Sequence, residues 1–256
     1  WSNAVDAAIT ALIVDDRSSG DAPAIILGTG DGRVLAYGFD GNPLWEYAFP
    51  ELAGGVRHLM IQDQLGDEHD RLVVEGQQAL YTLARTGTGV VGAPLATFDQ
   101  PIEAIYGIGQ TTELEPAIGL VVFLQDGAVR GLSSGGSEAD ERAWPLQLDG
   151  RPIVTDAGEG ALEAFQENIN AFLVATDNGS LKQLTISDDQ PVISWRLDGL
   201  VGIQAADWAD LDKDGRPDTG LVGTRDGHLW LYDQLYTRTP QRILELPLAS
   251  GIFHLA

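Results

Sequence analysis

Short runs of alternating hydrophobic and polar residues, joined through glycine turns, recur along the whole chain. The clearest copies contain an apolar run, a turn and a second alternating run, and they occupy residues 26–37, 73–81, 122–130, 174–184 and 222–232. Their turn glycines lie 44 to 52 residues apart and are Gly32, Gly76, Gly127, Gly179 and Gly227. Such alternation predicts half-buried strands. Asp-Gly or Asn-Gly between two such runs, present in four of the five copies, predicts a β-hairpin.

Each copy carries two further predicted strands. An apolar strand opens every unit, at residues 8–12, 55–59, 101–105, 151–155 and 202–206. A closing strand carries a tryptophan in three of the five units, namely Trp45, Trp144 and Trp195. Four short strands in about 50 residues are the unit of a β-propeller. The alternative, unrelated hairpins in a sandwich, does not account for the period.

The fold class predicted from the sequence is therefore all-β: a β-propeller with five four-stranded antiparallel blades. We expect residues 1–256 to form a single propeller domain or segment, with blades at about 5–50, 51–100, 101–149, 150–199 and 200–249. Both ends resemble the interior of the repeat, since Trp1 precedes Ile9 as Trp195 precedes Ile203 and residues 250–256 resemble a further opening strand. Either the parent ring has more blades, or the terminal strands close the ring on each other. Residues 160–168 have helix-forming composition, and we expect a loop or one helical turn there.

Two repeat families resemble parts of this pattern. The segment 28–40, followed by a tryptophan, is similar to the PQQ-like repeat of quinoproteins. In that family the tryptophan docks between adjacent blades. The matching positions here are Gly28, Asp31, Gly32 and Trp45, and more weakly Asn178, Gly179 and Trp195. The segment 206–218 resembles instead the FG-GAP or VCBS repeat of integrin-type propellers. The second resemblance implies a calcium-binding loop in the fifth blade.

The acidic residues of that loop have the spacing of a calcium site. Carboxylates recur at Asp210, Asp212, Asp214 and Asp218, while Gly215 permits a turn and the backbone carbonyl of Arg216 offers a further oxygen. Ca²⁺ prefers six to eight oxygen ligands from flexible loops, and clustered carboxylates repel one another unless they are neutralised. We therefore predict one structural Ca²⁺ at this loop. The alternative is an acidic Asx-turn without metal.

Other candidate groups are weaker. Asp63, Asp67 and Asp70 form a broken version of the acidic loop in the second blade, and Asp15, Arg17 and Ser19 stand at the equivalent positions of the first blade. His58 and His254 occupy the same repeat position, which suggests packing and not chemistry. No nucleophile motif, metalloprotease helix or phosphate loop is present in the sequence, and there is no cysteine for thiol catalysis or disulfides.

The net charge of the chain limits the classes of partner that it is expected to bind. A net charge of −23 disfavours nucleic acid and anionic membrane surfaces, which attract basic groups. No stretch is long and apolar enough for a membrane helix, so we expect no direct membrane insertion. A basic protein partner suits this charge. A calcium site of modest affinity is filled outside the cell, which favours an extracytoplasmic location, whether secreted, periplasmic or surface-exposed.

Three functions fit the sequence. The first is a non-catalytic protein-binding or assembly module, in which framework positions recur while loops such as 107–116 and 133–142 differ freely. The second is a carbohydrate-binding propeller, which needs an aromatic platform in each blade, whereas Trp208 and Trp230 stand in the fifth blade alone. The third, implied by the PQQ-like resemblance, is a fragment of a quinoprotein-type dehydrogenase. We favour the first and expect no enzymatic activity.

Overall fold

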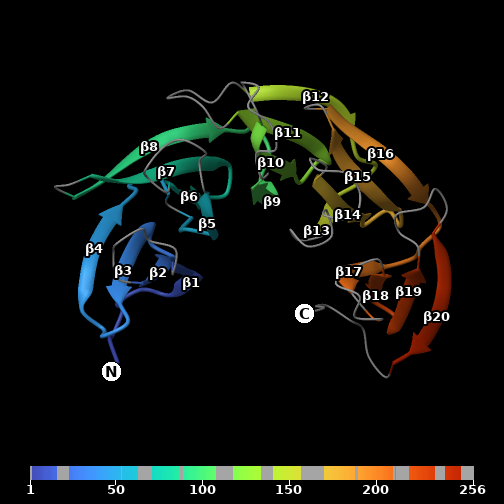
Figure 1. Cartoon of the computed structure of the whole chain (residues 1–256), viewed down its shortest axis with the longest axis horizontal. Coiled ribbons are helices and arrows are strands. Elements are labelled where there is room, and N and C mark those ends of the chain that lie inside the picture. The colour runs from blue at the N-terminus through green and yellow to red at the C-terminus, as the bar shows by residue number, and fades with distance from the viewer. Residues whose placement is uncertain are drawn as a thin grey trace. The chain divides into compact units, whose positions relative to one another are not determined.

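The computed structural model describes residues 2–15, 23–52, 54–62, 71–86, 89–107, 118–133, 141–156, 170–187, 190–209, 211, 219–233 and 240–248. These residues form five four-stranded antiparallel sheets, and no helix is present among them. Within every sheet the strands lie side by side in the order in which they follow along the chain (Figure 1). No helix of the described residues is long and apolar enough to cross a membrane.

The five sheets are the five predicted blades. The first contains β1 (Ile9–Asp15), β2 (Ala24–Thr29), β3 (Arg33–Gly38) and β4 (Pro43–Ala48). The second contains β5 (His58–Gln62), β6 (Arg71–Glu75), β7 (Ala79–Thr86) and β8 (Gly89–Thr97). The third contains β9 (Ile102–Gly107), β10 (Ile118–Leu124), β11 (Ala128–Ser133) and β12 (Glu141–Gln147). The fourth contains β13 (Pro152–Asp156), β14 (Asn170–Thr176), β15 (Leu181–Ser187) and β16 (Gln190–Leu197). The fifth contains β17 (Ile203–Ala209), β18 (Thr219–Thr224), β19 (His228–Asp233) and β20 (Gln241–Pro247).

The prediction of five four-stranded antiparallel blades is confirmed. The opening strands β1, β5, β9, β13 and β17 begin within three residues of the predicted positions. The possible helical turn at 160–168 lies outside the described residues. The structure divides into two compact units, which meet in sequence at Ile102 and Glu103: β1–β8 belong to the first unit and β10–β20 to the second.

The hairpin between the second and third strands follows the same chemistry in several blades. The turn glycines Gly32, Gly127, Gly179 and Gly227 have φ of 85 to 89°, a conformation that a side chain disfavours. In the first blade the buried Thr29 hydroxyl accepts a hydrogen bond from the Arg33 backbone N–H at 3.0 Å and donates to the Asp31 carboxylate at 2.5 Å. Thr224 repeats these bonds in the fifth blade. A buried threonine before the turn thus closes the hairpin.

The second blade departs from this pattern. Gly76, which the repeat aligns with the other turn glycines, does not have a positive φ. Its N–H donates to the Ala79 carbonyl, and Glu75 pairs directly with Leu80, so the turn differs in register from those of the first and fourth blades. The copy that lacks an Asp-Gly or Asn-Gly pair thus forms a turn with a different pairing register.

The middle sheets are buried on both faces, which explains their continuous apolar runs. Phe172 and Val174 on β14 pack into a cluster with Val121 and Trp144 of the third blade. Leu173, the residue between them, points to the opposite face. There it packs with residues of the fourth and fifth blades, including Leu181, Trp195, Ile203 and Val222.

Candidate functional site

The two ends of each sheet differ in the loops that they carry. Because the strands are antiparallel, the second-to-third turns lie at the edge where one blade connects to the next, while the first-to-second and third-to-fourth connections lie at the other edge. The second-to-third turns contain three or four residues in all five sheets. The first-to-second connections contain 8 to 13 residues and the third-to-fourth connections two to seven. The connections from one blade to the next, at the same edge as these turns, contain four to nine residues. We call the other edge, whose connections span the wider range of two to 13 residues, the variable edge.

The predicted calcium loop belongs to the variable edge of the fifth sheet. Asp210, Asp212, Asp214, Arg216 and Asp218 lie outside the described residues, so the predicted ligand set stays a prediction. The strands that flank the loop are described, and Ala209 pairs directly with Thr219. Among the described residues no group of three or more acidic or histidine side chains is arranged to hold a metal ion.

The remaining candidates from the sequence are only partly described. Arg17, Ser19, Asp63, Asp67, Asp70 and His254 lie outside the described residues. His58 begins β5, pairs with Glu75 and is exposed, so its repeat position does not make it a core residue. Trp208 and Trp230 both lie in the fifth sheet; Trp208 is buried in the core, and Arg242 lies over the Trp230 ring, 6.0 Å from its centroid.

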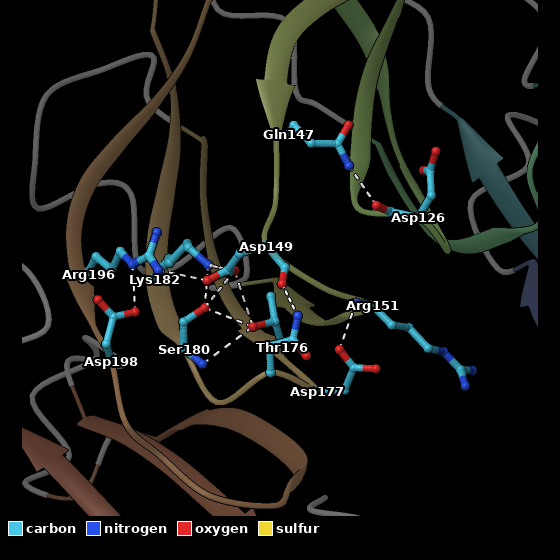
Figure 2. A network of polar contacts seen from close by, with 11 residues as sticks. Asp126, Gln147, Asp149, Arg151, Thr176, Asp177, Ser180, Lys182, Arg196 and Asp198 are labelled. Carbon is cyan, nitrogen blue, oxygen red and sulfur yellow. Dashed lines mark hydrogen bonds and ion pairs between the residues drawn. The ribbon is translucent and has the colours of Figure 1, made fainter.

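The structure brings together a polar cluster that the sequence did not reveal. It is centred on Asp149, in the connection between the third and fourth blades, and on the buried Lys182 of β15 (Figure 2). Lys182 is one of only two lysines in the chain, and its side chain is buried in the fourth sheet. A lysine at this depth is rarely found without an ionic partner. The available signal is that Lys182 alternates in phase with the buried Leu184 and Ile186, but the sequence does not identify the distant partner.

The Asp149 carboxylate accepts hydrogen bonds on both oxygens. Its Oδ1 receives the Lys182 ammonium, the Ser180 hydroxyl at 2.9 Å and the Thr176 hydroxyl at 3.3 Å. Its Oδ2 receives the Arg196 guanidinium at 2.7 Å. The Asp149 backbone carbonyl also accepts from the Asn178 side chain. One carboxylate therefore links the blade connection to three strands of the fourth sheet, β14, β15 and β16, and to the β14–β15 turn.

These contacts keep the carboxylate ionised. Burial by itself would raise the pKa of Asp149, but the hydrogen bonds from Lys182 and Ser180, with the charge of Lys182, outweigh burial and lower the pKa from 3.8 to about 2. An ionised carboxylate whose oxygens are occupied by donors is a structural ion pair, suited to fixing a connection. We therefore assign this cluster a structural role.

No protein-family model matches the sequence, and no curated protein matches it. The resemblances to PQQ-like and FG-GAP repeats thus stay predictions. The structure, in contrast, is similar to solved β-propellers.

Two crystal structures of BBS1N in complex with ARL6DN, soaked with lead and with mercury, match with TM-scores of 0.60 and 0.62 at 15% and 13% identity. They cover 91% and 96% of this chain, which in turn covers 63% and 68% of theirs. The crystal structure of Saccharomyces cerevisiae Sqt1 matches with a TM-score of 0.64 at 10% identity, covering 94% of this chain and 63% of its own. The chain thus spans about two thirds of the length of these structures. At this identity the similarity shows the fold alone, and the chain has the fold of a β-propeller.

Proposed function

We propose that this chain is a non-catalytic protein-binding module, and that its recognition surface is built from the variable edges of its blades. The observation that carries the proposal is the contrast between the two edges. The turns and blade connections at one edge contain three to nine residues, while the connections at the variable edge range from two to 13 residues. Rigid sheets that present loops of differing length are a common arrangement for binding.

Two further observations support a protein partner. BBS1N, whose fold is similar, was crystallised in complex with ARL6DN. The net charge of −23 favours a basic partner, whose association rate should fall as salt rises. The alternatives from the sequence, carbohydrate binding and quinoprotein chemistry, gain no comparable support from the described residues.

The connection between β11 and β12 offers a test of the proposal. It runs over residues 134–140, whereas the fourth blade makes the same connection with Asp188 and Asp189. Replacing 134–140 by Asp-Asp shortens the loop and keeps two acidic residues, so the net charge does not change. We expect partners captured from the native extract at low salt to bind this variant at least about tenfold more weakly, a loss of about 1.4 kcal/mol. Calorimetry with the purified partner measures this difference.

A matched control lies at the opposite edge of the third sheet. Gln125 is an exposed residue of the β10–β11 turn, so Gln125→Ser should retain the affinity of the wild-type chain. Equal losses in the two variants, or no partner at any salt concentration, would contradict the recognition surface. Saturable turnover of an alcohol, sugar or ester by the wild-type chain would overturn the non-catalytic assignment.

We also propose that one Ca²⁺ stabilises the fifth blade through Asp210, Asp212, Asp214, Asp218 and the carbonyl of Arg216. The donor set fits, since carboxylate and carbonyl oxygens are the ligands that this cation prefers. The site would order a loop at the variable edge and would take no part in catalysis. Its reliance on free calcium agrees with an extracytoplasmic location, which we propose with it.

Removing calcium should lower the melting temperature. A ligand that binds only the folded state at a hundred times its dissociation constant stabilises that state by about 2.7 kcal/mol. We therefore expect EGTA to lower the melting temperature of the wild-type chain but not that of Asp212→Asn. The control Asp189→Asn removes an acid from another loop and should respond as the wild type does. Superimposable melting curves of the wild type with and without EGTA would exclude the site.

A further inference from the structure

The turn between β14 and β15 differs from its counterparts in the residue that precedes the turn glycine. That residue is an aspartate in the first, third and fifth sheets, at Asp31, Asp126 and Asp226, but the fourth sheet has Asn178. Asn178 is also the only one of the five asparagines in the chain that is followed by glycine. The exception thus falls on the turn of the sheet that carries the Asp149 cluster.

In the first and fifth sheets the turn aspartate accepts a hydrogen bond from the threonine two residues before it. The Thr29 hydroxyl donates to the Asp31 carboxylate at 2.5 Å, and the Thr224 hydroxyl donates to the Asp226 carboxylate at the same distance. Each of these hairpins therefore closes through side chains of its own turn.

The fourth sheet uses a more distant carboxylate for the same purpose. Thr176 stands two residues before Asn178, but its hydroxyl donates to Oδ1 of Asp149, at 3.3 Å. The Asn178 side-chain amide donates to the backbone carbonyl of Asp149. An amide makes that bond and an ionised carboxylate does not, because the carboxylate has no hydrogen to donate. Asparagine in the turn thus allows the third-to-fourth connection to supply the carboxylate of this hairpin.

Asparagine before glycine is also a chemically reactive pair. The backbone nitrogen of Gly179 attacks Cγ of Asn178 and gives up its proton, a C–N bond forms, and the side-chain nitrogen leaves as ammonia. Water then opens the resulting succinimide to give aspartate or isoaspartate. The nitrogen of a glycine is poorly shielded in this step, because no side chain lies beside it. No oxidant or cofactor takes part.

The folded turn restrains both reacting groups. The Gly179 N–H donates to the Thr176 carbonyl at 2.9 Å, and the Asp149 carbonyl holds the Asn178 amide. Ring closure therefore requires the turn to open. Asn178 itself is exposed, so water has access to the succinimide once it has formed. The contacts of the Asp149 cluster thus determine how often the reaction starts.

We propose that Asn178 is a modification site, at which deamidation, gated by opening of the β14–β15 turn, changes the carboxylate that closes this hairpin. An aspartate at this position stands to Thr176 as Asp31 stands to Thr29, so it accepts the Thr176 hydroxyl in place of Asp149. The Asp149 carbonyl loses its donor, and the two carboxylates repel each other. The third-to-fourth connection is then held less tightly. The site lies at the edge opposite the variable edge and does not rest on the proposed function.

Incubation of the full chain at mildly alkaline pH, followed by peptide mass spectrometry, tests the gating. We expect conversion at Asn178 to be slow in the folded wild type. It should be at least about tenfold faster in Asp149→Ala, because the open turn is then more populated. Asn42 is an internal control, since Pro43 follows it and a proline nitrogen has no proton to lose.

Leu132→Ala is the matched control for general loss of stability. Leu132 is fully buried in β11 of the same unit, and truncation of a buried leucine costs about as much stability as we expect of Asp149→Ala. It should accelerate conversion less than Asp149→Ala does. Equal acceleration in the two variants at equal urea midpoints overturns the gating by the turn. Absence of conversion at Asn178 in Asp149→Ala, over a time in which the urea-unfolded chain converts, overturns the site.

Asn178→Asp tests the effect of the aspartate product. Asp-Gly favours the same turn as Asn-Gly, so the backbone of the turn is kept. We expect a lower urea midpoint than that of the wild type, and loss of the energetic coupling between Thr176→Val and Asp149→Ala. Gln125→Glu adds the same charge to the exposed β10–β11 turn and should leave the midpoint unchanged. A wild-type midpoint in Asn178→Asp, or undiminished coupling in that background, overturns the proposal.

Discussion

Asp149→Ala should destabilise the chain by about 2 to 3 kcal/mol. The substitution leaves the Lys182 ammonium, whose side chain is only 2% exposed, without its carboxylate. Removing one partner of a buried ion pair commonly costs about 3 to 5 kcal/mol. The Asp149 side chain is 34% exposed, so we reduce this figure for solvent screening. Equilibrium urea unfolding, with the second unit followed through the fluorescence of its tryptophans, measures the loss.

The double variant Asp149→Ala/Lys182→Met distinguishes loss of the ion pair from general disruption of the connection. Lys182→Met keeps the length and apolar stem of the side chain, so alone it should cost about 1 kcal/mol and should remove most of the penalty of Asp149→Ala. The control Asp198→Ala removes an acceptor of Arg196 that is 61% exposed and should cost less than about 0.5 kcal/mol. Strict additivity of the Asp149 and Lys182 substitutions would show that the pair is not coupled.

The ion pair also predicts the direction of a pH dependence. The folded-state pKa of Asp149, about 2, is lower than its ordinary value of 3.8. A lowered carboxylate pKa stabilises the folded state above the unfolded-state value, and the stabilisation is lost as pH falls through the folded-state value. The difference in unfolding free energy between the wild type and Asp149→Asn should therefore be constant above about pH 5 and should shrink towards pH 2. A difference that is unchanged over this range would contradict the assigned pKa.

Gly179→Ala should cost more than about 3 kcal/mol and is the second large effect that we expect. Gly179 has a φ of +85°, and a left-handed conformation costs an L-residue about 1 to 2 kcal/mol. A Cβ at this position would also lie 2.0 Å from the Leu200 carbonyl oxygen. That contact would displace the connection to the fifth blade and break the hydrogen bond from the Leu200 N–H to the Gly179 carbonyl. The free energy of unfolding of the purified variant measures the effect.

Gly199 supplies a control, because it has the same backbone conformation as Gly179 but has room for a side chain. Its φ is +83°, and a Cβ there would meet no atom within 4 Å. Gly199→Ala should therefore cost only the conformational penalty of about 1 to 2 kcal/mol. If the two substitutions cost the same, the close approach of Leu200 to the turn would have no energetic consequence.

Local sequence determined the strands and turns of this protein. Asp-Gly and Asn-Gly turns predicted four hairpins correctly, because positive φ is a property of the residues in the turn themselves. The period of 44 to 52 residues predicted five four-stranded sheets, because each copy repeats the same alternation and the same turn. Gly76 was aligned with the other turn glycines by sequence similarity, but its turn has a different register, which the pairing of Glu75 with Leu80 shows.

Tertiary structure alone decided which side chains meet and which stay uncovered. Asp149 and Lys182 are 33 residues apart, and neither marks its partner in the sequence; the fold of the fourth blade brings them together. When the fourth and fifth sheets are aligned through Gly179 and Gly227, Trp195 and Leu244 occupy equivalent positions, yet one is 5% exposed and the other 42%. Alternation specifies that a face is apolar, whereas burial depends on the neighbouring blade. Burial is therefore a property of packing between repeats, and no pattern within one repeat determines it.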